Sequence, residues 1–254
     1  MTRAVVPAVI EAGSSYYSPA MTDGIVAETI TMTGHGGDEI EAYLARPLDG
    51  NDQPSVVVLH HMPGYDRESK EAVRTFAVKG YAALMPNLHH RYAPGAKAGD
   101  AAAAARDAGG VPDDQCLGDV QGAIDVLRRR SESNGKIGVI GYCSGGRQTF
   151  MVACTLDVDA AVDCYGGRAD VDLAPQLRCP LLGLFGVDDQ SPSPDDVAML
   201  AKALEANGKT FDFTSYDGAG HAFFSVDRPS YRVDAAKDGW KRIWAFFGTH
   251  LKGA

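Results

Sequence analysis

Apolar residues fall into short, separated runs along the chain, and these runs predict buried β-strands. Residues 26–46 alternate between apolar and polar positions on both sides of a glycine-rich turn, which predicts an antiparallel hairpin. Later runs are more continuously apolar, which is typical of strands that are covered on both faces. We expect these later strands at residues 55–61, 81–88, 136–142, 159–167, 180–186 and 210–218.

Amphipathic segments between the apolar runs predict the helices. They lie at residues 67–79, 114–132, 144–156, 194–207 and 231–251. This alternation predicts a single doubly wound α/β domain, with a mostly parallel sheet of about eight strands flanked by helices. In this interpretation residues 1–23 form an N-terminal arm and residues 24–254 form the domain. The long segment 89–113, with its alanine-rich piece, is either disordered or a cap over a site.

Composition narrows the class of function. The 254 residues are 45% hydrophobic and carry a formal net charge of −9, which argues against nucleic-acid binding and against association with anionic membranes. No apolar stretch approaches the ~20 residues that span a bilayer, and the N-terminus lacks a signal-peptide core. Five cysteines without C-x-x-C spacing fit a reducing compartment. We therefore expect a cytoplasmic protein, monomeric or a small homo-oligomer, whose partner is a small molecule.

The segment GYCSGG, residues 141–146, lies between a predicted strand and a predicted helix. A strand, a G-x-nucleophile-x-G turn and a helix form a nucleophile elbow, in which small neighbours permit the sharp turn. The turn places Cys143 at a helix N-terminus, which favours the reactive thiolate. The backbone N–H of Ser144 then points to where an oxyanion would form. The alternative is a packed, inert cysteine, the interpretation we keep for Cys116, Cys154, Cys164 and Cys179.

Candidate partners for this cysteine follow the next strands of the predicted sheet. Asp188 and Asp189 come directly after the strand 180–186, and His221 follows the last strand in the sequence DGAGHAFF. Parallel strands end at the same edge of a sheet, so we expect these side chains near Cys143. A histidine can accept the thiol proton and return it to a leaving group, while an aspartate orients the imidazole. Taken singly, each residue is also common in surface loops.

The sequence resembles the dienelactone hydrolase (carboxymethylenebutenolidase) family of the α/β-hydrolase fold, from about residue 24 to the last helix. The motifs that carry the resemblance are SNGKIGVIGYC, GYCSGG, the GxxD of residues 186–189 and AGHAF at 219–223. The resemblance implies Cys143 as nucleophile, Asp189 rather than Asp188 as acid, and His221 as base.

The same resemblance implies an oxyanion hole and several substrate contacts. The oxyanion donors are the N–H groups of Ser144 and of Met62, in the loop HHMPGYD. The family anchors a substrate carboxylate with two arginines, and the second of these positions is Ser225 here, so Arg147 or Arg228 would have to substitute. His61 stands where the family has a glutamate that contacts the resting thiol. The expected substrate contacts are His61, Arg106, Tyr142 and Phe223.

Two histidine pairs, at residues 60–61 and 89–90, end successive strands and raise the possibility of a zinc site. Neighbouring residues on a strand point to opposite faces, so at most one histidine of each pair faces a shared pocket. No carboxylate or cysteine completes a known ligand spacing. We therefore expect neither a metal nor a cofactor. The aromatic face Trp240, Trp244 and Phe247 of the last helix is predicted to lie in the core.

These residues predict a hydrolase that cleaves a small lactone or ester of the dienelactone type through a thioester on Cys143. A carboxylesterase or thioesterase acting on another small acyl compound is the alternative among enzymes. A non-catalytic ligand-binding protein of the same fold is a further alternative. The presence of Cys143, Asp189 and His221 together argues against it.

Overall fold

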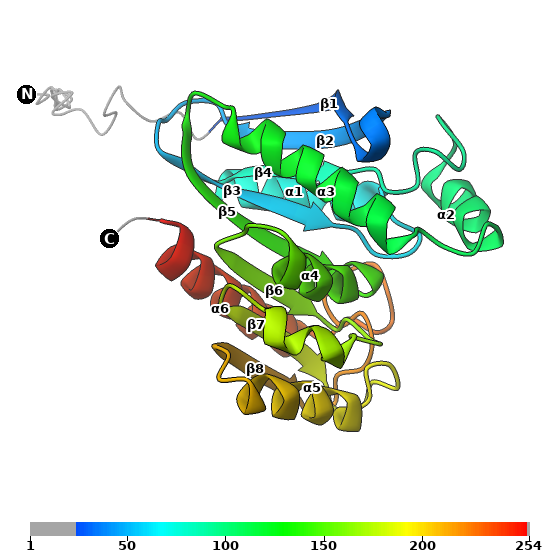
Figure 1. Cartoon of the computed structure of the whole chain (residues 1–254), viewed down its shortest axis with the longest axis vertical. Coiled ribbons are helices and arrows are strands. Elements are labelled where there is room, and N and C mark those ends of the chain that lie inside the picture. The colour runs from blue at the N-terminus through cyan, green and yellow to red at the C-terminus, as the bar shows by residue number, and fades with distance from the viewer. Residues whose placement is uncertain (1–23, 253–254) are drawn as a thin grey trace, which may run out of the picture.

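One eight-stranded sheet organises residues 24–252, the part of the chain that this computed structural model describes (Figure 1). The strand order is β1-β2-β4-β3-β5-β6-β7-β8. The strands are β1 (Ile25–Thr33), β2 (Glu39–Pro47), β3 (Gln53–Leu59), β4 (Ala82–Pro86), β5 (Ser133–Tyr142), β6 (Ala160–Cys164), β7 (Leu181–Gly186) and β8 (Phe211–Tyr216). The β1–β2 hairpin is antiparallel and lies at one edge, whereas β3 to β8 are parallel. The predicted fold class and hairpin are confirmed, and the predicted arm lies outside the described residues.

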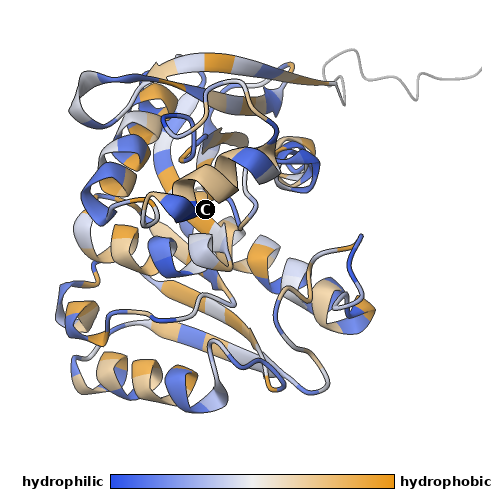
Figure 2. Ribbon diagram, turned by 90° about the vertical axis from the view of Figure 1, so that its right-hand side faces the viewer, coloured by the Kyte–Doolittle hydropathy of each residue, from blue (hydrophilic) through white to orange (hydrophobic). Residues whose placement is uncertain are grey.

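Helices cover both faces of this sheet (Figure 1). One face carries α1 (Arg67–Val78) and α6 (Val233–Leu251), and the other carries α3 (Asp113–Arg128), α4 (Ser144–Thr155) and α5 (Pro194–Ala206). Short 3₁₀ turns, η1 (His35–Gly37) and η2 (Val171–Gln176), complete the connections. Figure 2 shows hydrophobic residues along the central strands and a mixture of hydrophobic and hydrophilic residues on the helices. Among the described residues no helix has the length and apolar character needed to cross a membrane.

The buried strand β3 shows why the central runs are apolar throughout. Successive side chains of a strand point to opposite faces of the sheet. Val57 and Leu59 belong to the core under α3 and α4, whereas Val56 and Val58 belong to the core under α1 and α6. All four side chains are at most 1% exposed. Both faces must therefore be apolar, and the alternation of a one-sided strand disappears.

The segment 89–113 is not irregular, because it contains the helix α2 (Ala98–Asp107). Ala101, Ala102 and Ala105 are buried, and their small side chains allow the helix to approach its neighbours closely. Figure 1 shows α2 beyond the arrow tips of the strands, at the carboxyl edge of the sheet. The alanine-rich piece thus forms an ordered helix at the edge where the candidate catalytic residues lie.

A buried carboxyl group supports the joint between β5 and α4. Asp163 on β6 is fully buried, and its Oδ1 accepts a hydrogen bond of 2.8 Å from the N–H of Gly166. A Cβ at Gly146 would lie 2.3 Å from the same oxygen, so the carboxyl group packs directly against the first turn of α4. Its Oδ2 has no partner among the described residues. Burial raises the pKa of Asp163 to about 7, because the charged form is poorly solvated there.

We expect Asp163→Asn to change the pH dependence of stability. The raised pKa means that the unfolded chain loses this proton first, so the native protein becomes less stable as pH rises from about 4 towards about 7. The free energy of unfolding of the variant, relative to that of the native protein, should therefore be about 3 kcal/mol higher at about pH 8 than at about pH 5. Urea unfolding at both pH values measures this difference. An equal stability difference at the two pH values would show that Asp163 ionises normally.

Candidate active site

Cys143 lies in a sharp turn between the end of β5 and the first residue of α4. Its φ of 59° and ψ of −118° are unusual for a residue with a side chain, which is a feature of strained nucleophile turns. The neighbouring glycines make this turn possible. A Cβ at Gly141 would lie 2.0 Å from the carbonyl oxygen of Gly145, and one at Gly145 would lie 2.3 Å from that of Leu59. The backbone therefore excludes side chains on both sides of the cysteine.

Cys143, His221 and Asp189 lie in one row at the carboxyl edge of the sheet. Asp189 follows β7, and its Oδ2 lies 2.8 Å from Nδ1 of His221, which follows β8. The imidazole also forms a hydrogen bond with the Cys143 side chain. Oδ1 of Asp189 accepts a bond of 2.9 Å from the N–H of Ser191, which fixes the nearly buried carboxylate. Asp188 is exposed and has no such contact with the histidine.

The thiol and the imidazole change each other's pKa. Burial raises the pKa of Cys143, but the hydrogen bond and charge of His221, with the N–H groups of Ser144 and Met62, offset it and lower the pKa overall. The hydrogen bond to the sulfur is also the main reason why the pKa of His221 rises to about 9. Each group thus favours the charged form of the other. These mutual effects favour a thiolate beside an imidazolium over two neutral groups.

Two backbone donors are directed at the same sulfur from different parts of the chain. The N–H of Ser144 belongs to the first turn of α4, and the N–H of Met62 belongs to the loop after β3. Converging N–H groups beside a nucleophile are the arrangement that stabilises an oxyanion on a bound acyl group. The site therefore brings together a thiol, an imidazole, a carboxylate and two backbone N–H groups, the set of groups that acyl transfer through a nucleophile requires.

A pocket lies between α1 and α6 on the side of these residues, and it contains only part of the expected substrate contacts. His61 and Tyr142 line it. Phe223 does not line it, because its ring is fully buried and packs 5.3 Å from the ring of Tyr165. Phe224 lines the pocket in its place. The one-residue difference arises because the loop after His221 turns the first phenylalanine into the core.

None of the three candidate arginines lines this pocket. Arg106 is exposed on α2, and its charge lowers the pKa of His89, which burial lowers more strongly. Arg147 is bound to Asp113 through two hydrogen bonds of 3.0 Å each, so its guanidinium is already engaged. Arg228 is exposed in the loop between β8 and α6. The pocket is therefore without an arginine from this set.

The histidine pairs serve different purposes. Nε2 of His60 accepts a hydrogen bond of 3.3 Å from the N–H of Leu88, and its Nδ1 lies 3.1 Å from the carbonyl oxygen of His61. The first of these contacts links the end of β3 to the end of β4. Burial is the main cause that lowers the pKa of His60 to about 3, so its ring is neutral. The ring of His89 packs edge-on against it at 4.7 Å. His60 therefore has a structural role at the edge of the sheet.

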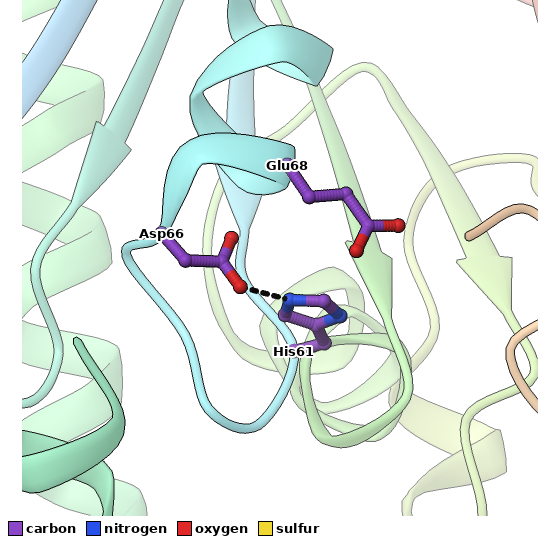
Figure 3. A group of neighbouring side chains, drawn as sticks. All are labelled: His61, Asp66 and Glu68. Carbon is purple, nitrogen blue, oxygen red and sulfur yellow. Dashed lines mark hydrogen bonds and ion pairs between the residues drawn. The ribbon is translucent and has the colours of Figure 1, made fainter. Parts of the chain in front are cut away.

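His61, in contrast, faces two carboxylates at the start of α1, as Figure 3 shows. Its Nε2 lies 2.9 Å from Oδ2 of Asp66, whose Oδ1 accepts a bond of 2.8 Å from the N–H of Ser69 and caps α1. The ligand atoms of His61, Asp66 and Glu68 lie within 4.8 Å of one another, which is the spacing of a possible metal site. Both oxygens of Asp66 already have partners, so this group is first of all a helix cap that orients His61.

Sequence analysis missed several residues that surround the site. Tyr165 follows β6, and its ring lies 5.2 Å from that of His221. Glu68, Phe224, Trp240 and Trp244 line the pocket. Tyr165 carried a usable signal, because it follows a strand at the active edge. Trp240, Trp244 and Phe247 were all expected in the core. Phe247 is fully buried there, whereas both tryptophans remain partly exposed.

The sheet order, the nucleophile turn after β5 and the histidine after the last strand define an α/β hydrolase. The model of the dienelactone hydrolase family matches residues 40–251, so the chain belongs to this family of carboxymethylenebutenolidase-like hydrolases, which act on carboxylic esters. A Methylorubrum extorquens protein named "Putative carboxymethylenebutenolidase" is 32% identical over 244 residues, covering 89% of this chain and 81% of the relative.

Two further proteins show the same relationship. An Escherichia coli K12 protein, also named "Putative carboxymethylenebutenolidase", is 32% identical over 238 residues, covering 89% of this chain and 88% of that protein. Among solved structures, the crystal structure of a "Putative Dienelactone Hydrolase" from Klebsiella pneumoniae superposes with a TM-score of 0.83. It is 30% identical and covers 89% of this chain and 100% of that chain.

Alkylation by iodoacetamide should select Cys143 from the five cysteines. Its pKa is lowered, whereas burial raises the pKa values of Cys116, Cys154 and Cys179 to about 12 and also raises that of Cys164 well above its ordinary value. We expect fast, single-site labelling at neutral pH, measured by peptide mass spectrometry. In His221→Asn the labelling rate at this pH should fall at least tenfold and recover at alkaline pH. Equal rates in both proteins would contradict the ion pair.

Proposed function

We propose that the protein hydrolyses a small lactone or carboxylic ester through a thioester on Cys143. The observation that carries the proposal is the continuous set of contacts from Asp189 through His221 to the sulfur. A thiolate held at neutral pH beside a protonated imidazole is prepared both to attack a carbonyl and to protonate the group that leaves. Membership of the dienelactone hydrolase family supports the same class of reaction.

In the first half of the reaction the Cys143 sulfur attacks the carbonyl carbon and a C–S bond forms. The negative charge moves to the carbonyl oxygen, which the N–H groups of Ser144 and Met62 stabilise in this proposal. The C–O bond to the alcohol then breaks, and His221 gives its proton to the departing oxygen. In a lactone, this oxygen remains attached to the acyl group through the opened ring.

In the second half, water replaces the alcohol. His221, now neutral and still bound to Asp189, accepts a proton from the water as its oxygen attacks the thioester carbon. The C–S bond breaks and the sulfur leaves as a thiolate, which restores the resting pair with the imidazolium. No net proton is gained or lost by the enzyme over the cycle, so the same two residues can begin another turnover.

Paired substitutions test the assignment of the catalytic residues. Cys143→Ala should reduce hydrolysis of a lactone and ester panel to the background, and Asp189→Asn should lower kcat by about 10²- to 10⁴-fold. The matched controls are Cys179→Ala and Asp188→Asn, which change the same residue types outside the row of contacts. These controls should retain activity within a few fold. Steady-state kinetics decides the matter, and full activity of Cys143→Ala would rule out the thioester.

The raised pKa of His221 predicts where activity falls at high pH. The imidazolium that protonates the leaving group persists up to its pKa of about 9, so kcat/KM for an ethyl ester should decline only above about pH 9. A nitrophenyl ester needs little leaving-group protonation and should show a weaker decline. In Asp189→Asn the decline should move to lower pH, because the carboxylate helps to raise this pKa. A decline near pH 6.5 in the native protein would contradict the paired state.

A further inference from the structure

The pocket beside the candidate active site is a groove between two helices. Its empty volume is about 820 Å³, including the open solvent at its mouth, and it lies between α1 and α6. The reaction proposed above uses residues next to one end of this groove but none of those along its length. A large, partly apolar depression that adjoins a nucleophile is a candidate for binding the part of the substrate that does not react.

One wall of the groove is a single stripe of α1. Glu68, Ala72 and Thr75 of α1 and its C-cap residue Lys79 line it, at intervals of four, three and four residues, and Ser69 and Glu71 flank this row. Residues at this spacing lie on one face of a helix and cover three turns, which corresponds to roughly 16 Å along the axis. The small side chain of Ala72 at the centre keeps the groove open. The groove is therefore elongated rather than a compact cavity for a single ring.

The opposite wall is formed by Trp240 and Trp244 on α6. Their rings stack with a centroid distance of 4.9 Å and an angle of 15°, which gives a flat apolar surface. Both rings remain partly exposed, although tryptophan gains strongly from burial. They are also the only two tryptophans in the sequence. Any molecule that occupies the groove must therefore change the environment of all the tryptophan in the protein.

One end of the groove meets the reacting residues. Tyr165 lines the groove, and its ring lies 5.2 Å from that of His221. Tyr142, another lining residue, directly precedes the nucleophile Cys143. The groove therefore adjoins the residues that react in the proposed mechanism. This continuity assigns the groove to the substrate rather than to an unrelated ligand.

The charges at this end disfavour an anionic substrate. Glu68 extends over the His61 imidazole, and it forms no hydrogen bond or ion pair within residues 24–252 (Figure 3). The position of the second arginine anchor is occupied by Ser225, which is 1% exposed. The one cationic lining residue, Lys79, lies at the far end of the α1 stripe, 5.9 Å from the Trp244 ring. A substrate carboxylate near the nucleophile would therefore meet a like charge.

We infer that this groove binds an uncharged, apolar acyl chain of the substrate, so that the protein prefers neutral esters of medium-length acids to small anionic lactones. The inference depends on the proposed ester hydrolysis for its kinetic consequence, but not for the binding itself. Burial of a methylene group is worth roughly a fourfold gain in affinity. Several methylene groups in the groove would therefore dominate the choice of substrate.

Tryptophan fluorescence of the native protein tests the binding without any reaction. Titration with octanol should change the emission and give an affinity at least tenfold higher than titration with butanol. Octanoate should bind more weakly than octanol, and Glu68→Gln should reduce this difference. Tighter binding of octanoate than of octanol, abolished by Lys79→Met, would overturn the inference that the bound chain is uncharged. An absence of any chain-length effect would overturn the assignment of the groove.

Kinetics with ethyl acetate, ethyl butyrate and ethyl octanoate test the consequence for catalysis. We expect kcat/KM to rise at least tenfold from butyrate to octanoate. Ala72→Phe, which fills the groove, should remove this increase in kcat/KM with chain length. Val78→Phe is the matched control, since it introduces the same ring on the same helix at a residue that is 68% exposed and outside the groove. Circular dichroism checks that both variants fold.

The two sets of results separate the inference from the proposed function. Chain-dependent fluorescence without hydrolysis of any ester would retain the groove and reject the hydrolytic proposal. Hydrolysis with equal kcat/KM for all three esters would retain the catalytic residues and reject the groove. Loss of the octanoate preference in both Ala72→Phe and Val78→Phe would also reject it, because the effect would then not be specific to the lining position.

Discussion

The contact between Cys143 and His221 is the interaction on which the proposed reaction depends. Without the imidazolium, burial would keep the sulfur protonated, as it does for the four other cysteines. Without the thiolate, the main cause that raises the pKa of His221 disappears. The backbone turn at Cys143 and the carboxylate of Asp189 hold these two side chains in contact. The surrounding fold therefore serves to hold the side chains of Cys143 and His221 in contact.

The parallel sheet explains why the positions of these residues could be predicted from the sequence. Strands β5, β7 and β8 end at one edge, so residues that directly follow them must lie near one another whatever the rest of the sequence does. The pattern of apolar runs was enough to locate these three ends, and hence to place Cys143, Asp189 and His221 together. The glycines around the cysteine gave an independent local signal, because the turn cannot form with larger side chains.

Other parts of the site depend on packing that no local pattern records. Phe223 and Phe224 are adjacent, chemically identical and both buried in the same core, yet only Phe224 also lines the groove, since only the loop geometry distinguishes them. The tryptophans of α6 show the same limit. The helical period correctly predicts that their face points inward, but it does not predict that α1 and α6 remain far enough apart to leave a groove.

The charges near the nucleophile separate the reaction from the choice of substrate. The ion pair needs a histidine, an aspartate and two amides, and none of these groups distinguishes one acyl group from another. Discrimination must then come from residues that contact the rest of the molecule, which here are aromatic rings together with the carboxylate of Glu68. A chain can retain the reacting residues of its family while its neighbouring helices select a different substrate. In this protein the arginines lie outside the groove, and apolar contact is the main source of binding energy that the groove offers.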